Sequence, residues 1–489
     1  MSKIIFVNPP LTLKDRYGKF NLGGTVMPPL GLTNLAAMTR EKGYHTKIID
    51  GEIMRLDELS IAQAIAEERP DYVGITAVTL SIAKAAKIAG LIKSLVPSVK
   101  VIIGGPHITA LPEKTFRIFK NFDIAVLGEG DITVCELLEA LDRNSSLSDV
   151  KGIMFWRNNE LVITQPRELI ADLDKLPLPA WDLLPDLRRL YRPPINAFNR
   201  FPVGYLITSR GCYGRCIYCS RAVYKNKVRL HSAEYIVKMI KDLQNRFRVK
   251  EILFDDDEFL VNRQRIERLA ELFNTHKIRI SWSCLSRIKK LDPDLLRTLK
   301  KMGCWQISFG IESGDQGILD FLKKDTTLTQ IESTLEAAQK SGIRTKGFFM
   351  IGHAIDTHES IKNTIRFAQK IALNDLQSSV FTPLPGSEIY GIARQYGTFD
   401  ERWEKMNYWN IVFVPNGLTS EELLRYQKEL FTKFYFRAHI IFFYMMMIRN
   451  PYQLASIFRA FTAFLKFIFS QRTKERTTEL SYHEESITS

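Results

Sequence analysis

Three of the chain's six cysteines lie within eight residues, in the stretch ITSRGCYGRCIYCSRAVY at 207–224. They are Cys212, Cys216 and Cys219. A disulfide framework does not suit them, because a local trio leaves one thiol unpaired. The chain also starts with MSKIIFVNPP, which has the pattern of a strand and not of a secretory signal. We therefore expect a reducing, cytoplasmic setting, in which free thiols are available to bind metal.

The spacing C-x₃-C-x₂-C favours an iron–sulfur cluster over a zinc site. A zinc site needs a fourth ligand, but the nearest histidine is His231 and the chain has no second C-x₂-C pair. Thiolates are soft ligands that suit iron–sulfur clusters, and a four-iron cluster held by three cysteines leaves one iron open. The other cysteines stand in apolar patterns and are expected to be buried, inert thiols: Cys135, Cys284 and Cys304.

The cysteines follow the first strand of a run of β/α units. Expected strands lie at 204–208, 250–254, 279–283, 305–309, 345–351 and 377–382, and expected helices at 233–247, 263–275, 293–301, 328–340 and 358–372. Six units are too few for a closed eightfold barrel. We therefore expect a partial barrel, open on one side, with its site at the carboxyl ends of the strands.

A second set of alternating strands and helices precedes the barrel. Strands are expected at 3–8, 45–50, 71–76, 99–104 and 123–127, which predicts a parallel, doubly wound sheet. Small or glycine-rich residues follow these strands and would let a bulky ligand approach the backbone, although such turns also occur without a ligand. The candidate contacts are Thr76, Gly104, Gly105, His107 and Gly128. No G-x-G-x-x-G follows the first strand, so a nicotinamide site is poorly supported.

The chain is thus expected to belong to the α/β class and to contain four parts. A Rossmann-like domain covers 1–165, and a proline-rich connector covers 166–203. A partial (β/α)6 barrel at 204–395 is followed by a helical region at 396–489.

The segment from Gly211 to Cys219, with the aromatic Tyr218 before the third cysteine, resembles the signature of the radical S-adenosylmethionine (SAM) superfamily. In that superfamily the amino and carboxylate groups of SAM chelate the open iron. The resemblance therefore implies a [4Fe–4S] cluster on the three cysteines, with SAM bound beside Tyr218.

Further candidate contacts with SAM follow later barrel strands. In FDDDEF, the resemblance implies that Asp256 and Asp257 receive the SAM ammonium group, and a solvated acidic turn is the alternative. Glu312 in GIESG resembles the family position that contacts the ribose or the amino acid part. Arg287 could bind a carboxylate at two points, or it could be a surface charge.

The N-terminal part resembles the cobalamin-binding class of radical SAM enzymes. GGPHIT, GEGD, the proline-rich connector and the cysteine motif occur in the same order, and the likeness covers roughly residues 1 to 400. Many cobalamin proteins carry a D-x-H-x-x-G loop after the first strand, but residues 9–30 contain no histidine. We therefore expect cobalamin without a histidine ligand from that loop. His107 is either a contact to the corrin or a satisfied histidine at a strand end.

These resemblances imply that SAM is cleaved to a 5′-deoxyadenosyl radical, with an electron from a donor such as flavodoxin or ferredoxin. Methylcobalamin would then donate a methyl group to an unactivated carbon of a small molecule, which makes the chain a C-methyltransferase. One alternative is an oxidative cyclase of the anaerobic porphyrin-ester type. Another is a tRNA methylthiotransferase, but such enzymes carry further N-terminal cysteines, and none precedes Cys135 here.

The net charge of +14 indicates an anionic partner and is concentrated near the C-terminus. Residues 423–474 contain nine Lys/Arg, one acid and fourteen Phe/Tyr. An apolar stripe at 454–468 has helical spacing, and the apolar run at 438–448 is too short to span a bilayer. We expect peripheral attachment to the inner face of an anionic membrane and a lipid-like substrate. Alternatively, both helices close the open side of the barrel; nucleic acid is less suited, because the aromatic residues share a face with aliphatic ones.

Overall fold

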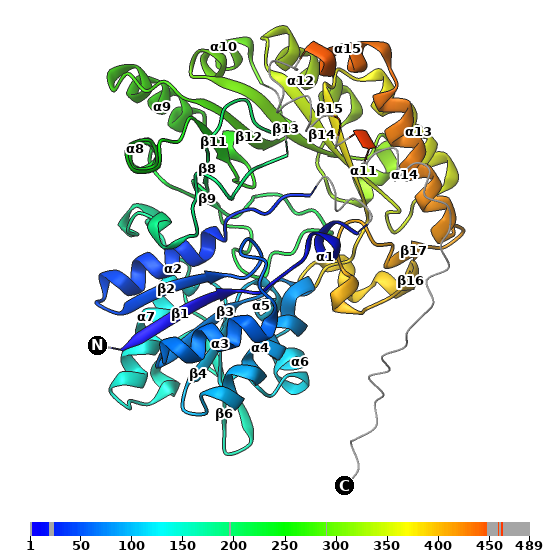
Figure 1. Cartoon of the computed structure of the whole chain (residues 1–489). Helices are drawn as coiled ribbons and strands as arrows, with labels where there is room; N and C mark the ends of the chain where they lie inside the picture. The colour runs from blue at the N-terminus through cyan, green and yellow to red at the C-terminus, as the bar shows by residue number, and fades with distance from the viewer. Residues whose placement is uncertain are drawn as a thin grey trace.

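The computed structural model describes residues 2–18, 24–194, 197–289 and 291–446, together with 458, 461 and 462. An N-terminal α/β unit lies below a larger α/β unit in Figure 1, and a C-terminal helix runs along the side of the larger one. The expected α/β class, with two parallel-strand sheets, is confirmed. The limits given above for the four parts of the chain stay predictions.

The N-terminal sheet has seven strands in the order β2-β1-β3-β4-β5-β6-β7. They are β1 (Lys3–Asn8), β2 (His45–Asp50), β3 (Tyr72–Thr76), β4 (Lys100–Gly104), β5 (Ile124–Val126), β6 (Ile153–Arg157) and β7 (Glu160–Ile163). The first five are parallel, as expected. In this strand order a ligand binds beyond the carboxyl ends of β1 and β3, where successive connections leave in opposite directions.

The last two strands depart from the expected parallel sheet. β6 pairs antiparallel with both β5 and β7. Asn158 and Asn159 form the turn between β6 and β7 with φ of 51° and 64°. Asparagine tolerates this left-handed conformation, and two such residues in succession make a tight hairpin turn. The Asn-Asn pair between two apolar runs was therefore a usable hairpin signal.

Both faces of the N-terminal sheet are covered by helices. Ile4 and Phe6 of β1 face one core and Ile5 and Val7 face the other, as the two-residue period of a strand requires. The first core contains α2 (Leu30–Glu41) and α7 (Gly130–Asp142), and the second contains α3 (Glu58–Glu68), α4 (Ile82–Leu95), α5 (Pro106–Ala110) and α6 (Pro112–Ile118). A short helix, α1 (Leu13–Tyr17), follows β1 and lies between the two units in Figure 1.

The second sheet has six parallel strands in the order β15-β14-β13-β12-β11-β8. They are β8 (Val203–Leu206), β11 (Glu251–Phe254), β12 (Ser281–Arg287), β13 (Cys304–Glu312), β14 (Arg344–Ile351) and β15 (Asp375–Val380). The sheet does not close on itself, which confirms the expected open barrel. The helices between the strands are α8 (Ala233–Phe247), α9 (Arg263–Thr275), α10 (Pro293–Lys301), α11 (Gln316–Phe321), α12 (Leu328–Lys340) and α13 (His358–Lys370).

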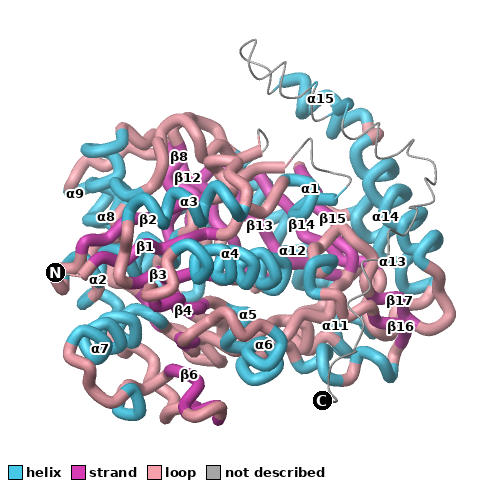
Figure 2. Tube along the Cα trace, turned by 60° about the horizontal axis from the view of Figure 1, so that its bottom comes forward, coloured by secondary structure: helices cyan, strands magenta, loops and turns pink. Residues whose placement is uncertain are grey.

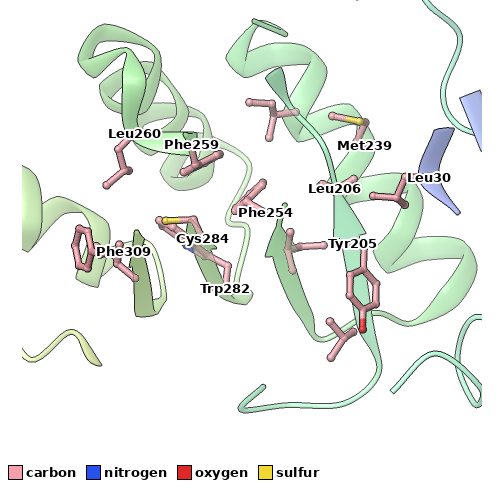
Figure 3. Close-up of a cluster of buried hydrophobic side chains, with 14 of the residues drawn as sticks. Leu30, Tyr205, Leu206, Met239, Phe254, Phe259, Leu260, Trp282, Cys284 and Phe309 are labelled. Atoms are coloured by element: carbon pink, nitrogen blue, oxygen red, sulfur yellow. The ribbon is translucent and has the colours of Figure 1, made fainter. Parts of the chain in front are cut away.

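A buried aromatic cluster packs around β11 and β12 (Figure 3). The rings of Phe254 and Phe259 stack with centroids 4.1 Å apart, and Trp282 packs edge-on against both. The indole Nε1 of Trp282 donates to the Met302 carbonyl at 2.9 Å, so its polar atom is satisfied in the core. Cys284 lies in the same cluster, and the three cysteines expected to be buried are buried.

The C-terminal region begins with a small antiparallel pair, β16 (Gly397–Phe399) and β17 (Phe413–Pro415). Helix α14 (Ser420–Tyr435) then packs against β15 and α13, with Leu423, Leu430 and Phe434 buried. Helix α14 thus covers the β15 side of the barrel sheet, and it precedes the two segments, 438–448 and 454–468, for which that role was the alternative.

The next helix, α15 (Ala438–Met446), lies at the edge of the molecule in Figure 2. Most of the expected stripe at 454–468 lies outside the described residues, but Phe458 and Phe461 belong to them and are exposed. Among the described helices, none has the length and apolar character needed to cross a bilayer.

Candidate functional site

The three cysteines lie on one loop at the carboxyl end of the barrel. This cysteine loop, residues 211–228, leaves from β9 (Ser209–Arg210) and returns through β10 (Arg229–Leu230), which pairs antiparallel with β9. Both short strands follow β8, the first strand of the barrel sheet. The loop therefore occupies the position where barrel folds place their chemistry.

A buried arginine fixes the middle of the cysteine loop. Nη1 of Arg287, the last residue of β12, donates to the Cys216 sulfur at 3.3 Å, and its Nη2 donates to the Lys324 carbonyl at 2.7 Å. A Cβ at Gly214 would lie 2.1 Å from the Arg287 Nη1 atom, so a larger residue here would displace the Arg287 guanidinium. Arg287 is buried, which corrects the alternative of a surface charge, and its contact with a carboxylate stays a prediction.

The cysteine set has the chemistry of a cluster site. A hydrogen bond from the Cys219 thiol, followed by the charges of Lys324 and Arg287, lowers the pKa of the Cys216 thiol. A lowered pKa favours the thiolate, which is the form that binds metal. Within the described ranges, no three His, Cys, Asp or Glu side chains are grouped closely enough for a single metal ion. Thiols alone, one for each of three irons, suit a four-iron cluster better.

A buried ion pair lies beside the loop. Lys324 Nζ donates to Glu312 Oε1 at 2.7 Å and to the Tyr218 hydroxyl at 3.1 Å. Glu312 ends β13 with φ of 70°, a conformation that is costly for a residue other than glycine and is often found at functional sites. A Cβ at Gly310 would lie 2.6 Å from Glu312 Oε1, so glycine leaves space for the pair. Lys324 could not be identified from sequence, because one of two adjacent lysines in a turn carries no signal of burial.

The structure separates the two aspartates that were expected to receive the SAM ammonium group. Asp256 is buried, and its carboxylate accepts hydrogen bonds from the Thr208 amide at 2.7 Å, the Thr208 hydroxyl at 2.9 Å and the Ser209 hydroxyl. It therefore holds the backbone before β9, which corrects its expected role. Asp257 is exposed to solvent, so its carboxylate is the one of the two that a ligand can reach.

The candidate residues of the N-terminal unit lie along the carboxyl edge of its sheet. Thr76 ends β3, Gly104 ends β4, and Gly105 and Gly128 follow β4 and β5. Gly105 has φ of 105°, and a Cβ there would lie 2.8 Å from the Ala77 carbonyl oxygen. Gly128 has φ of 77° and open space where its Cβ would be. The edge is thus lined by backbone that a large flat ligand can approach closely.

His107 is satisfied within the protein and does not belong to that edge. Its ring is 1% exposed, with Nδ1 at 3.1 Å from the Thr79 hydroxyl and Nε2 at 3.2 Å from the Thr115 hydroxyl. Trp403 packs edge-on against the ring at 4.5 Å. Burial, followed by the charge of Lys114, lowers the pKa of His107 to about 4, so the ring is neutral. The contact between His107 and a corrin is therefore corrected to the alternative, a satisfied histidine.

The segment at 407–408, which carries no functional signal in the sequence, connects the two units. The Asn407 side-chain amide donates to the Asp15 carbonyl at 2.7 Å, which joins this segment to α1. The Tyr408 carbonyl accepts from the Val380 amide at 2.9 Å, at the carboxyl end of β15. The Tyr408 side chain is 54% exposed, and desolvation, followed by the charge of Cys219, raises its pKa. The Tyr408 ring is thus accessible to a ligand at the end of the barrel that carries the cysteine loop.

Comparison with known proteins finds one matching family model in each of the two α/β units. The model of the radical SAM superfamily matches residues 206–368, and that of the B12 binding domain matches residues 22–138. An uncharacterized methyltransferase of Pyrococcus horikoshii is 33% identical over 442 residues, which are 90% of this chain and 94% of the relative. The chain belongs to the cobalamin-dependent radical SAM methyltransferase family.

Members of this family and its relatives share the architecture across both units. The anaerobic magnesium-protoporphyrin IX monomethyl ester cyclase of Rubrivivax gelatinosus is 26% identical over 434 residues, or 86% of this chain and 75% of the cyclase. The solved structure of the cobalamin-dependent SAM radical enzyme OxsB has a TM-score of 0.74 and 17% identity. That match covers 95% of this chain and 72% of OxsB, and it shows a common fold.

Family membership assigns the chain three cofactors: a [4Fe–4S] cluster, SAM and cobalamin. The residues present fit them. Cys212, Cys216 and Cys219 supply thiols for three irons, and the edge at Gly128 leaves backbone open to a corrin. A putative methylthiotransferase of Methanocaldococcus jannaschii is 25% identical over 281 residues, or 55% of this chain, so the methylthiotransferase stays the alternative given above.

Proposed function

We propose that the protein transfers a methyl group from SAM to an unactivated carbon of a lipophilic small molecule. The observation that carries the proposal is the union in one chain of the cysteine loop, the buried Glu312–Lys324 pair and the carboxyl edge of a B12-binding sheet. When bound, the cluster and cobalamin would supply one-electron cleavage of SAM and relay of its methyl group. The electron would come from a small donor protein of the flavodoxin or ferredoxin type.

The residues around the cysteine loop would bind and orient SAM. Asp257 is the acidic residue open to the SAM ammonium group, and Glu312 is fixed by Lys324 at the end of β13. Lys324 itself places a cation beside Tyr218, where the SAM carboxylate can be bound. Arg287 keeps Cys216, one of the cluster ligands, in position.

Oxidative cyclisation is the second candidate, because relatives that carry the cyclase name match most of this chain. The two reactions differ in what happens to the SAM methyl group, which enters the product only in methylation. Reconstituted protein should therefore be incubated with a reductant, a cell lipid extract and SAM labelled in the methyl group. Label in an extracted lipid supports methylation, whereas an oxidised, unlabelled product would favour cyclisation.

Tyr408 is proposed to contact the substrate, because its ring is accessible beside Cys219 on the segment that joins the two units. We predict that Tyr408→Ala lowers the yield of labelled product at least about tenfold while the iron content stays unchanged. The reason is loss of a large apolar contact, worth roughly 1.5–3 kcal/mol. Tyr408→Phe keeps the ring and should retain most of the yield. Wild-type yield from the alanine variant would contradict the assignment.

We further propose that α15 attaches the protein to an anionic membrane, which would bring it to a lipid-like substrate. Its outward residues share one face of the helix: Ile441, Phe442, Met445 and Met446. Phe442 is 60% exposed and Met446 is 65% exposed, so this face is uncovered in the described part of the chain. The sequence from 447 to 474 then supplies five basic residues and no acid. Apolar burial together with attraction to anionic lipid is the way interfacial helices bind.

Flotation with vesicles tests this attachment. Wild-type protein should float with anionic vesicles, and more weakly with neutral ones or at high salt. The variant Ile441→Ser/Phe442→Ser/Met445→Ser should stay in the soluble fraction at an unchanged melting temperature. Ile118→Ser, which changes an exposed apolar residue of α6, is the matched control and should float. Point variants are used because a truncation before α14 would also remove that helix, which covers the barrel sheet, and would expose its buried face. Equal flotation of the triple variant and the wild type would rule out attachment through α15.

A further inference from the structure

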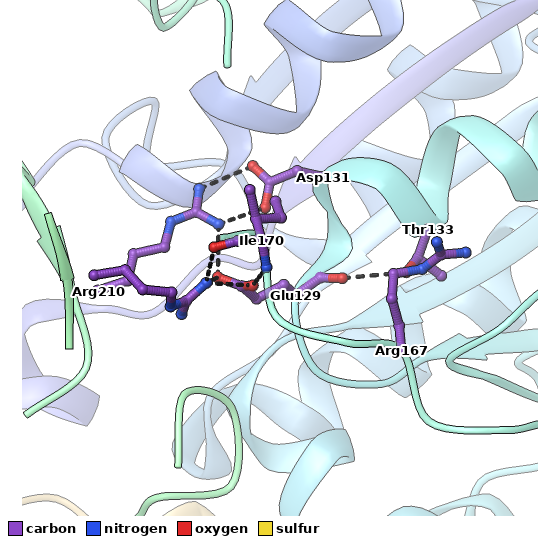
Figure 4. Close-up of polar contacts among 7 residues, drawn as sticks. Glu129, Asp131, Thr133, Arg167, Ile170 and Arg210 are labelled. Carbon is purple, nitrogen blue, oxygen red and sulfur yellow. Dashed lines mark hydrogen bonds and ion pairs between the residues drawn. The ribbon is translucent and has the colours of Figure 1, made fainter. Parts of the chain in front are cut away.

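Four buried charged side chains connect the N-terminal unit to the cysteine loop (Figure 4). Arg210 Nη1 donates to Glu129 at 2.9 Å and to Asp131 at 2.7 Å, and its Nη2 donates to Asp131 at 3.0 Å. Arg229 Nη1 donates to both oxygens of Glu129, at 2.9 and 2.8 Å. All four side chains are between 3% and 10% exposed. Two positive and two negative charges balance within this interdomain cluster.

The two arginines stand at the base of the cysteine loop. Arg210 of β9 lies directly opposite Arg229 of β10, so together they mark the points where the loop begins and ends. Both donate to the same carboxylate, that of Glu129. Cys212 is only two residues beyond Arg210. Any displacement of Glu129 is therefore applied to both ends of the loop that carries the cysteines.

The acidic side of the interdomain cluster adjoins the edge where cobalamin binds. Gly128, with open space at its Cα, directly precedes Glu129, and Asp131 lies in the first turn of α7. Glu129 also accepts from the Ile170 amide of the connector at 2.9 Å. The path from Gly128 at the cobalamin edge to the cysteine loop thus runs through Glu129 and its ion pair with Arg210, the residue directly before the loop. This is a short, contiguous path of stiff contacts.

Simple stabilisation explains this arrangement poorly. Buried ion pairs often contribute little net stability, because desolvation of the charges offsets their attraction. They do fix geometry, since guanidinium–carboxylate pairs of this kind bond at defined distances and directions. Here the geometry that is fixed is the position of one cofactor site relative to another. A role in positioning thus follows from where the interdomain cluster lies.

We propose that Glu129 and Asp131 are positioning residues that couple the cobalamin edge to the cysteine loop through Arg210 and Arg229. Binding of cobalamin then lowers the rate at which the cysteine loop loses its cluster. By reciprocity, a bound cluster tightens the hold on cobalamin. The proposal rests on the proposed function in one respect, the binding of cobalamin.

The rate of iron release from reconstituted full-length protein tests this coupling. An iron chelator is added with and without saturating hydroxocobalamin, and the ratio of the two rates is the coupling. We expect hydroxocobalamin to slow release from wild-type protein at least about fivefold, the low end of usual coupling between sites. In Glu129→Gln the ratio should fall towards one, although iron and cobalamin still bind. Glu136→Gln is the matched control: it removes a carboxylate from the same helix that pairs with Arg167 of the connector, and should keep the wild-type ratio.

Asp131→Asn provides a second variant if Glu129→Gln does not fold, because it leaves the Arg229–Glu129 pair in place. It should also lower the ratio. The inference is overturned if either folded variant keeps the wild-type ratio, or if wild-type protein binds hydroxocobalamin without any change in iron release. That last result leaves the proposed function intact. Failure of wild-type protein to bind hydroxocobalamin at all would instead remove the proposed function together with the coupling.

Discussion

Protein with Cys216→Ala is expected to lose its cluster and, with it, the cleavage of SAM. Cys216 is the buried thiol that Arg287 and Cys219 hold in position, and its pKa is lowered, so it is available as a thiolate. Removal of one of three thiolates leaves a second iron open and the cluster labile. Formation of 5′-deoxyadenosine should fall at least ~10²-fold, since loss of an outer partner alone costs about 10- to 100-fold. Iron content and 5′-deoxyadenosine are measured after anaerobic reconstitution.

Cys135→Ala provides the control for this variant. Cys135 is also buried, but it lies on α7 of the N-terminal unit and not on the cysteine loop. The control should keep both its iron and its SAM cleavage. Formation of 5′-deoxyadenosine by protein that lacks all three loop cysteines would be incompatible with a cluster in this loop.

Lys324→Met is expected to have the second largest effect. Its ammonium group is buried and pairs with Glu312 at 2.7 Å, next to Tyr218 and the cysteine loop. The variant removes the cation proposed to bind the SAM carboxylate, and loss of one partner of a buried charge pair between protein and ligand costs about 2–5 kcal/mol of binding free energy. We therefore expect SAM to bind at least ~30-fold more weakly, with near-normal iron content. Equilibrium dialysis of the reconstituted variant with labelled SAM measures the loss.

The neighbouring Lys323 allows a sharp comparison. It is half exposed and pairs with Glu388 on the surface, where an ion pair is worth little. Lys323→Met should therefore bind SAM as the wild type does. If both variants bound SAM normally, the Glu312–Lys324 pair would have no part in the SAM site.

The barrel helices other than the short α11, which was not predicted, could be predicted from sequence because their signals are local. Each has an apolar face of helical period and starts after a residue whose side chain accepts from the backbone of the first turn. Those residues are Ser232, Asn262, Asp292, Thr327 and Thr357. The cysteines were recognisable for a similar reason, since their spacing within one loop is itself the motif.

Partners distant in sequence could not be predicted in the same way. Arg210 and Glu129 are 81 residues apart. Nothing in the local sequence around either residue indicates that they form an ion pair. The row of acids at 255–258 showed that carboxylates were present. It did not show that the Asp256 carboxylate would accept hydrogen bonds from Thr208 and Ser209. Which polar atoms remain free for a ligand depends on tertiary contacts.

The central claim is that one polypeptide holds the cluster and cobalamin and passes the SAM methyl group from one site to the other. The most direct measurement uses full-length protein reconstituted with iron, sulfide and hydroxocobalamin, then incubated anaerobically with reductant and SAM labelled in the methyl group. We predict that label is recovered on the extracted cobalamin together with S-adenosylhomocysteine, and that 5′-deoxyadenosine forms in the same sample. Release of 5′-deoxyadenosine with no label on cobalamin, at full occupancy of both cofactors, would contradict the account.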